Sequence, residues 1–238
     1  MRVVASRTTS DFPKGSAIVT EMPTTLTEVP ADKLSELAAY SGDPWTRENP
    51  YFTRAEAHME SLWKKHLEPF LEGCDFSHTI DLGAGHGRNS VKLSPLAGRL
   101  TIMDIQPGNI DACKQRFAGR ANTAFFVNNG FDLQPVHDND VTLVYCFDAM
   151  VHFDSDVVRS YLRDTRRVLI PGGRGFFHHS NYSGGDDWRA NPKSRNFMTK
   201  ELFAHYARKE GLQVLSQRVI DWGDSPNIDC LTLVERGK

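Results

Sequence analysis

The sequence predicts an α/β fold built on an open, mostly parallel β-sheet with helices on both faces. From Thr79 onward, short apolar runs alternate with segments of helical periodicity, which is typical of βαβ units. The first apolar run ends in a glycine-rich turn, 83–87, and the second ends in Asp104. The last two apolar runs are joined by residues 221–227, which are too few for a helical crossover, so an antiparallel pair should finish the sheet.

Length and charge limit the possible functions. The chain has 238 residues, which suits one domain with an appendage, and its 28 basic and 30 acidic residues give a net charge of −2. This balance lacks the basic footprint of a nucleic-acid-binding protein. No run approaches the roughly 20 apolar residues of a membrane span, and the start of the chain lacks a signal peptide, so a cytoplasmic protein is expected.

The cysteines indicate neither a disulfide framework nor a zinc site. Cys74, Cys113, Cys146 and Cys230 are widely scattered and show no C-x-x-C spacing. We therefore expect four ordinary thiols in a reducing compartment.

The amino-terminal region, 1–52, is expected to form an arm and a lid ahead of the main domain at 53–238. Residues 1–30 are rich in Thr, Ser and Pro with little periodicity, which favours an extended arm. A short helix is predicted over 31–40. The loop after it carries aromatic residues, including Tyr51, which either cover a pocket or pack against the sheet.

The remaining elements follow in order. Thr53 and Glu56 form a capping box that predicts a helix running to about Phe70. Strands are predicted near 78–82, 100–104, 123–127, 141–147 and 174–179, and helices near 88–96, 108–118 and 155–168. After a polar insertion, Thr199 is expected to cap a helix that ends near Lys209, and strands near 212–220 and 228–235 complete the chain.

The glycine-rich turn predicts a nucleoside site. Glycines let the backbone turn sharply and approach a ligand, and Asp104 is placed to accept hydrogen bonds from a ribose diol. The spacing is G-x-G-x-G, with Arg88 where a dinucleotide fingerprint has its third glycine. Asp81 beside the turn would repel a pyrophosphate but would suit a cationic amino-acid head group.

Residues 81–87, D-L-G-A-G-H-G, resemble motif I of the class I S-adenosylmethionine-dependent methyltransferases, and Asp104 falls where their ribose-binding acid lies. The resemblance implies a Rossmann-like, doubly wound sheet of seven strands in the order 3-2-1-4-5-7-6, with the last strand antiparallel. It also implies S-adenosyl-L-methionine as the cofactor. The Phe-Asp and Val-His at 147–152 and the His-His-Ser-Asn at 178–181 are similar to a bacterial subgroup acting on small molecules and glycans.

The resemblance also implies a cofactor site at the carboxyl ends of the strands. Its residues would be Asp81, Gly83, Ala84, Gly85, Gly87, Asp104, Ile105, Asn129, Gly130, Phe131, Phe147 and Asp148. By this analogy, Asn129 or Asp132 would bond the adenine amino group, and the segment around Asp148 would pass beneath the methionyl group.

Two adjacent histidines, His178 and His179, are the predicted catalytic residues, with Asp148 orienting either a histidine or the acceptor. A histidine has a pKa near 7 and can take a proton from a hydroxyl within hydrogen-bond reach. Because neighbouring strand residues point to opposite faces, only one of the two should face the pocket. Residues predicted to contact the acceptor are Tyr51, His152, Asn181, Tyr182 and Trp188. No compact ligand spacing is present, so no metal site is predicted.

The predicted function is methyl transfer from S-adenosylmethionine to a hydroxyl of a small polar acceptor, foremost a sugar or a glycan or natural-product intermediate. Transfer to an amine or a protein nitrogen is the alternative, because it would keep every cofactor motif and need no base. An NAD(P)-dependent oxidoreductase is a more distant alternative that Arg88 and the terminal hairpin disfavour. A small-molecule partner and no nucleic acid are expected, and a homo-oligomer is left open.

Overall fold

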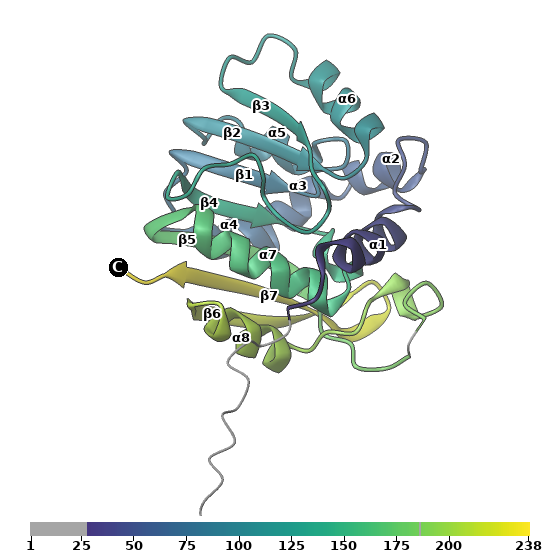
Figure 1. Ribbon diagram of the computed structural model, residues 1–238. Coiled ribbons are helices and arrows are strands. Elements are labelled where there is room, and N and C mark those ends of the chain that lie inside the picture. Colours follow the sequence, from purple (N-terminus) through teal and green to yellow (C-terminus); the bar gives the residue numbers. More distant parts are fainter. Residues whose placement is uncertain (1–27, 186) are drawn as a thin grey trace, which may run out of the picture.

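One seven-stranded sheet runs through the molecule, with its strands in the order β3-β2-β1-β4-β5-β7-β6 (Figure 1). The structure, a computed structural model, describes residues 28–185 and 187–238, so the predicted arm lies largely outside the described residues. Strands β1 to β5 pair in parallel, whereas β7 is antiparallel to both β5 and β6. The predicted sheet order and the terminal hairpin are confirmed.

The elements have the following bounds. The strands are β1 His78–Leu82, β2 Arg99–Asp104, β3 Thr123–Val127, β4 Val141–Cys146, β5 Leu169–Ser180, β6 Leu212–Trp222 and β7 Ser225–Arg236. The α-helices are α1 Ala31–Gly42, α2 Tyr51–Glu56, α3 Met59–Leu62, α4 Glu68–Leu71, α5 Arg88–Leu93, α6 Pro107–Arg116, α7 Ser155–Val168 and α8 Lys200–Lys209. A π-helical turn spans Trp63–Leu67, and 3₁₀ turns span Met150–His152 and Pro192–Ser194.

The helix predicted from Thr53 is the main difference from the sequence analysis. The chain turns helical two residues earlier, at Tyr51, and then forms three short helices, α2 to α4, separated by a bend and the π-helical turn. Pro69 lies in the first turn of α4, where its missing N–H removes a bond that a continuous helix would need. By contrast, Thr199 caps α8 as predicted, because its hydroxyl accepts a hydrogen bond from Leu202 N at 3.1 Å.

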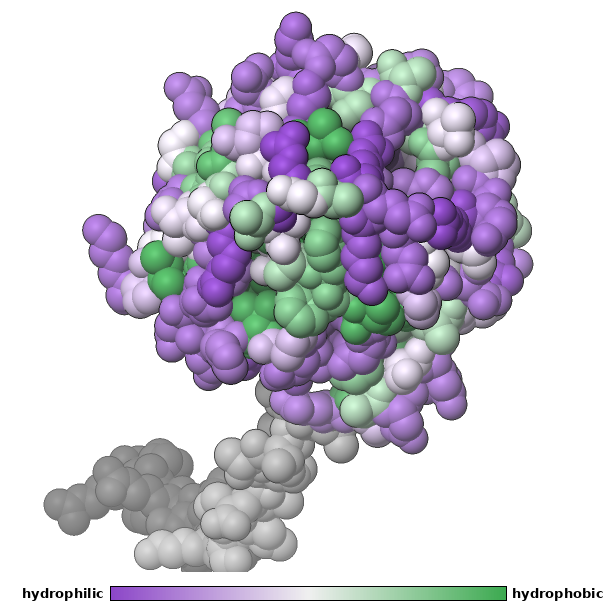
Figure 2. Space-filling view, turned by 90° about the horizontal axis from the view of Figure 1, so that it is seen from above, coloured by the Kyte–Doolittle hydropathy of each residue, from purple (hydrophilic) through white to green (hydrophobic). Residues whose placement is uncertain are grey.

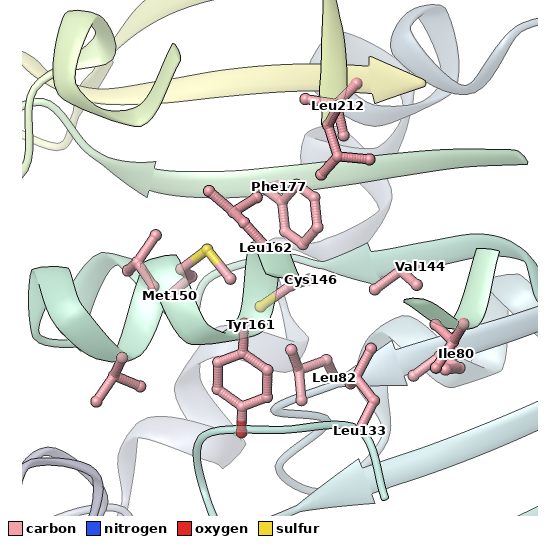
Figure 3. Packing of buried hydrophobic residues seen from close by; sticks show 14 of the residues in the cluster. Ile80, Leu82, Leu133, Val144, Cys146, Met150, Tyr161, Leu162, Phe177 and Leu212 are labelled. Atoms are coloured by element: carbon pink, nitrogen blue, oxygen red, sulfur yellow. The ribbon is translucent and has the colours of Figure 1, made fainter. Parts of the chain in front are cut away.

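Apolar side chains fill both faces of the sheet and give the molecule three layers. On one face, Ile80 and Val144 pack beneath α1, α7 and α8, in the cluster drawn in Figure 3. On the other face, Leu143 and Phe176 pack against α3 to α6. Alternation along each strand assigns neighbouring residues to opposite layers, as it does for Leu143 and Val144.

The carboxyl ends of the parallel strands meet at one edge of the sheet, and α1 and α2 lie beside that edge (Figure 1). Ligands of open parallel sheets bind at this edge, so the elements there define the site. The face at the β3 side of the molecule is mostly hydrophilic, with apolar side chains in small patches (Figure 2). Among the described residues, no helix is long and apolar enough to cross a membrane.

Candidate functional site

A pocket opens at the carboxyl ends of β1, β2 and β4, beneath α1 and α2. It contains about 650 Å³ of space free of protein atoms, part of it open to solvent. Its lining residues come from six segments: Ala38, Ser41, Gly42, Trp45, Tyr51, Phe52, Leu82, Gly83, Gly85, Asp104, Ile105, Asn109, Asn128, Gly130, Asp148, Ala149, His152, Phe153 and Tyr161. A smaller pocket beside it adds Ala84 and Phe147.

The glycine-rich turn forms the floor of the pocket. Gly83 and Gly85 have φ values of +68° and +55°, a region that favours glycine. A Cβ at Gly83 would lie 2.6 Å from the Cβ of Ala149, and one at Gly85 would lie 2.5 Å from the ring of Phe52. Close packing of Ala149 and Phe52 over the turn therefore requires glycine at both positions. Gly87 lies behind the floor, where it precedes α5.

Asp104 ends β2 as predicted and lies in the pocket wall. One carboxylate oxygen accepts the Gly85 N–H at 2.8 Å, and the other accepts the Gln106 N–H at 2.8 Å and the Asn109 amide at 3.1 Å. Burial raises the pKa of this carboxyl, although these hydrogen bonds oppose the rise. A carboxylate has about four acceptor positions, so three protein donors leave room for a ribose hydroxyl.

Asp81 lies beneath the turn and has an acceptor to spare. Its Oδ2 accepts a hydrogen bond from the Ser90 hydroxyl, whereas its buried Oδ1 has no partner among the described residues. Burial raises the pKa of Asp81 to about 7. Asp81 is buried and lines neither of the two pockets, so its contact with the amino-acid end of S-adenosylmethionine stays a prediction.

At the other end of the pocket the lining residue is Asn128 rather than the predicted Asn129. Asn129 turns back to its own loop, where its side-chain oxygen accepts the N–H groups of Phe131 and Asp132 at 3.1 Å. Asn128 donates a hydrogen bond to the Tyr161 hydroxyl at 2.9 Å, and both residues line the pocket. Phe131 packs against the core beneath α7 and does not line the pocket.

Asp148 is the centre of a buried charged cluster after β4. Its Oδ2 accepts hydrogen bonds from the Tyr51 hydroxyl and the Arg88 guanidinium, and its φ is +60°. Burial and the Asp148 charge raise the pKa of Tyr51, so the hydroxyl stays protonated. Burial alone would lower the pKa of Arg88, but Asp148 and Tyr51 raise it. In the sequence, Arg88 stands out only because it occupies the position of the third glycine of a dinucleotide fingerprint.

The structure places His178 beneath this cluster instead of in the pocket. Its ring is fully buried and stacks on Phe147 with centroids 4.7 Å apart. Nδ1 accepts the Asp148 N–H at 3.2 Å, so Nε2 carries the proton and donates it to Asp229 at 3.0 Å. Both ring nitrogens are engaged within the protein, which leaves no lone pair for an acceptor. His178 instead holds the backbone of Asp148.

The partner of His178 belongs to a buried ion pair. Asp229 in β7 accepts two hydrogen bonds from Arg195, at 2.8 and 2.6 Å, and both side chains are almost fully buried. Burial alone would raise the pKa of Asp229, but His178 and Arg195 lower it to about 2. Arg195, Asp229 and His178 thus form a chain of contacts that ends at Asp148.

His179 faces the opposite side of the sheet, as strand alternation predicts. Its ring lies flat on Phe203 of α8, with centroids 3.9 Å apart. Its nitrogens contact the Ser180 carbonyl and the Thr232 hydroxyl, both at 2.8 Å, and burial lowers its pKa to about 3. Neither predicted catalytic histidine lines the pocket, because the core encloses one ring on each face.

A third histidine, His152, does line the pocket. Its Nδ1 lies 2.6 Å from the Ser194 carbonyl oxygen, which can only accept, so Nδ1 carries the proton and Nε2 has the lone pair. No described residue bonds Nε2. The ring stacks on Trp45 at 4.5 Å between centroids, and burial lowers the pKa of His152 to about 4, so the imidazole is neutral near pH 7.

The three acceptor-contact residues predicted after β5 build the loop that follows this strand. Asn181 donates to the Asn227 carbonyl and accepts from Lys200 N, both at 3.0 Å. Tyr182 pairs with Met198, and Trp188 is buried with its ring edge-on to that of Tyr40. They line none of the pockets described above.

Within the described part of the chain, no group of three or more His, Cys, Asp or Glu side chains could hold a metal ion.

Several pocket-lining residues were not named from the sequence. Those in α1 are Ala38, Ser41 and Gly42, and those in other segments are Leu82, Asn109, Asn128, Ala149, Phe153 and Tyr161. Trp45 and Phe52, which line the pocket with Tyr51, belong to the aromatic cluster from which a lid was predicted. The small residues of α1 gave no signal, because their role is to leave space.

Comparison with known proteins agrees with this geometry. Residues 80–173 match the family model described as "Methyltransferase domain". Nodulation protein S of Rhizobium tropici is 25% identical over 201 residues, which cover 82% of this chain and 75% of that protein. The matched family segment begins in β1 and includes the glycine-rich turn, Asp104 and Asp148.

Solved structures share the fold at low sequence identity. A S-adenosylmethionine-dependent methyltransferase from Leishmania major superposes with a TM-score of 0.64 and 15% identity, covering 86% of this chain and 82% of its own. Geranyl diphosphate C-methyltransferase from Streptomyces coelicolor, solved with S-adenosyl-L-homocysteine, gives 0.59 and 16%, covering 76% and 77%. Residues 80–173 thus match a methyltransferase domain, and the chain has the fold of S-adenosylmethionine-dependent methyltransferases.

Proposed function

We propose that the enzyme transfers the methyl group of S-adenosylmethionine to a hydroxyl of a small polar acceptor, foremost a sugar or a related glycan or natural-product intermediate. The bound cofactor supplies a sulfonium methyl group that an oxygen lone pair can displace. The main support for oxygen as the acceptor atom is the environment of His152. Its neutral ring lines the pocket, and no described residue bonds its Nε2. A hydroxyl must lose its proton during methylation, and this nitrogen can receive it.

Different residues would bind the cofactor, orient the acceptor and remove its proton. Asp104 would hold the ribose, and Asp81 would face the amino-acid end. Tyr51 and Arg88 fix the carboxylate of Asp148 in the pocket wall, where it can orient the acceptor. Holding the acceptor oxygen close to the methyl group and in line with the breaking carbon–sulfur bond would supply a large part of the rate enhancement.

Nitrogen is the second candidate for the acceptor atom. A neutral amine already carries a lone pair and needs no base, so transfer to an amine would leave Nε2 of His152 without a role.

Variants of His152 test this role once the acceptor has been found with labelled cofactor. His152→Phe keeps an aromatic ring against Trp45 but lacks the lone pair, and turnover should fall about 10²–10⁴-fold. His152→Ala should show the same loss. S-adenosylhomocysteine affinity should stay within about threefold in both, and the exposed His137→Phe should behave as the parent protein. Turnover within about threefold of the parent in His152→Phe would exclude a proton-accepting role.

The dependence of activity on pH tests the role of His152 independently of the variants. Since the pKa of His152 lies near 4, activity should be flat from about pH 6 to 8 and fall only as the pH approaches 4 to 5. A rise of activity through pH 6 to 7 would instead indicate an unburied imidazole as the base.

The four cysteines are free thiols, which supports a cytoplasmic setting for this reaction.

A further inference from the structure

A wide groove adjoins the pocket on the side of α2, α3 and the β6–β7 turn. It contains about 1500 Å³ of space free of protein atoms, much of it open to solvent. Tyr51 lines both the groove and the pocket, and Arg88 lines the groove and the smaller pocket. Since both residues bond Asp148, the groove reaches the pocket wall at the charged cluster.

Positive charge gathers in this groove although the whole chain has a net charge of −2. Four of the residues that line the groove carry a positive charge, namely Arg54, Lys65, Arg88 and Lys193. Asp221 is the only acidic residue among those that line it. Asp221 is turned toward the hairpin turn, where it accepts the Asn227 N–H at 2.8 Å.

Two of these cations are available to a ligand. Arg54 and Lys65 are exposed, and neither forms an ion pair within the described part of the chain. Lys193 contacts Asp224, which is 84% exposed and can release it at little cost. Arg88 is committed to Asp148. A concave surface of this kind concentrates anions.

A rigid aromatic ring adds a second type of contact. Trp222, at the end of β6, lines the groove and is half-buried. Its ring packs against Phe147 and His178, with centroids 6.0 and 5.0 Å away, so its orientation is fixed by the core. Tryptophan combines a flat apolar surface with a polar N–H group, which suits the faces of an amphipathic, ring-shaped molecule such as a sugar.

We propose that this groove binds the acceptor and that the acceptor carries an oxyanion, such as a phosphate or carboxylate, on a ring that packs against Trp222. The inference rests on the proposed function in placing a small polar acceptor beside the cofactor pocket. Arg54 and Lys65 would contact the oxyanion, and Tyr51 lies where the groove meets the pocket. The acceptor class is therefore an acidic or phosphorylated sugar-like molecule rather than a neutral or cationic one.

Binding measured without catalysis tests this proposal separately from the transfer reaction. We would titrate four compounds into the protein saturated with S-adenosylhomocysteine: glucose 6-phosphate, glucuronate, glucose and glucosamine. Binding would be measured by NMR chemical-shift changes or by calorimetry. We expect the phosphate, the carboxylate or both to bind, more weakly as salt rises from 50 to 500 mM, and glucose and glucosamine to bind at least about tenfold more weakly. The two anions distinguish phosphate from carboxylate recognition.

Charge-removing variants locate the site. Arg54→Gln combined with Lys65→Gln should weaken anion binding at least about tenfold and leave S-adenosylhomocysteine affinity unchanged. Arg120→Gln with Lys209→Gln makes the same charge change at exposed residues outside the groove and should have no effect.

Equal binding of anionic and neutral sugars, no binding by any of the four, or an unaffected Arg54/Lys65 double variant would each overturn the proposal. Anion binding in the groove combined with methylation at nitrogen would sustain this inference while refuting oxygen as the acceptor atom. Methylation at oxygen of a neutral acceptor, with no anion binding, would give the reverse result.

Discussion

Replacing Asp229 by Asn should destabilise the protein strongly, because it removes the only charge that balances Arg195 within the buried chain of contacts. The Arg195 side chain is 2% exposed and that of Asp229 is fully buried, so water cannot replace the lost carboxylate. Removing one partner of such a pair costs about 3–5 kcal/mol. At about 2–4 °C per kcal/mol for a chain of this size, the melting temperature should fall by about 6–20 °C.

Thermal unfolding followed by circular dichroism at pH 7.5 measures this shift, with Asp224→Asn as the matched control. Asp224 also forms an ion pair, with Lys193, but its side chain is 84% exposed, so its loss should leave the melting temperature unchanged. A decrease of less than about 2 °C in Asp229→Asn would refute the view that this buried ion pair stabilises the fold.

Two further predictions concern the cofactor. Asp104→Asn should weaken S-adenosylhomocysteine binding by about 1.5–3 kcal/mol, or roughly 10–150-fold in calorimetry, because a charged acceptor for the ribose is lost; the exposed Asp111→Asn in α6 should bind normally, and an unchanged affinity in Asp104→Asn would contradict the assignment. The lid predicted over 31–52 should gain hydrogen-exchange protection on binding, since Phe52 stacks on His86 above the glycine-rich turn. Identical exchange with and without S-adenosylhomocysteine would indicate plain structural packing there.

The fold could be predicted closely because its signals are local. Apolar runs and turn residues located all seven strands, and Thr199 marked the start of α8. The start of β5 was placed too late, at 174 instead of Leu169. Pro171 and two glycines lie in this first part of β5, and the sheet tolerates them where its register with β4 shifts.

The site was harder to predict because its contacts join distant segments. Arg88 and Asp148 are 60 residues apart, and no local pattern pairs them. The sequence showed that His178 and His179 face opposite sides, but only the pairing of β5 with β7 places Asp229 next to His178.

His152 illustrates the same limit. Its free Nε2 depends on the carbonyl of Ser194, 42 residues away, and on burial beside Trp45. A histidine at the end of a short turn, such as His152, looks the same in sequence whether its ring is packed or reactive. The difference lies in which nitrogen is bonded, and this requires coordinates.

The identity of the methylated atom decides between oxygen, nitrogen and carbon as the acceptor. The enzyme would be incubated with S-adenosylmethionine carrying a ¹³C-labelled methyl group and a panel of phosphorylated, acidic, neutral and amino sugars, and the product would be examined by NMR. We expect a new methyl group attached to oxygen, formed about 10²–10⁴-fold more slowly in His152→Phe. A methyl group on nitrogen or carbon, formed at the same rate in His152→Phe, would contradict it.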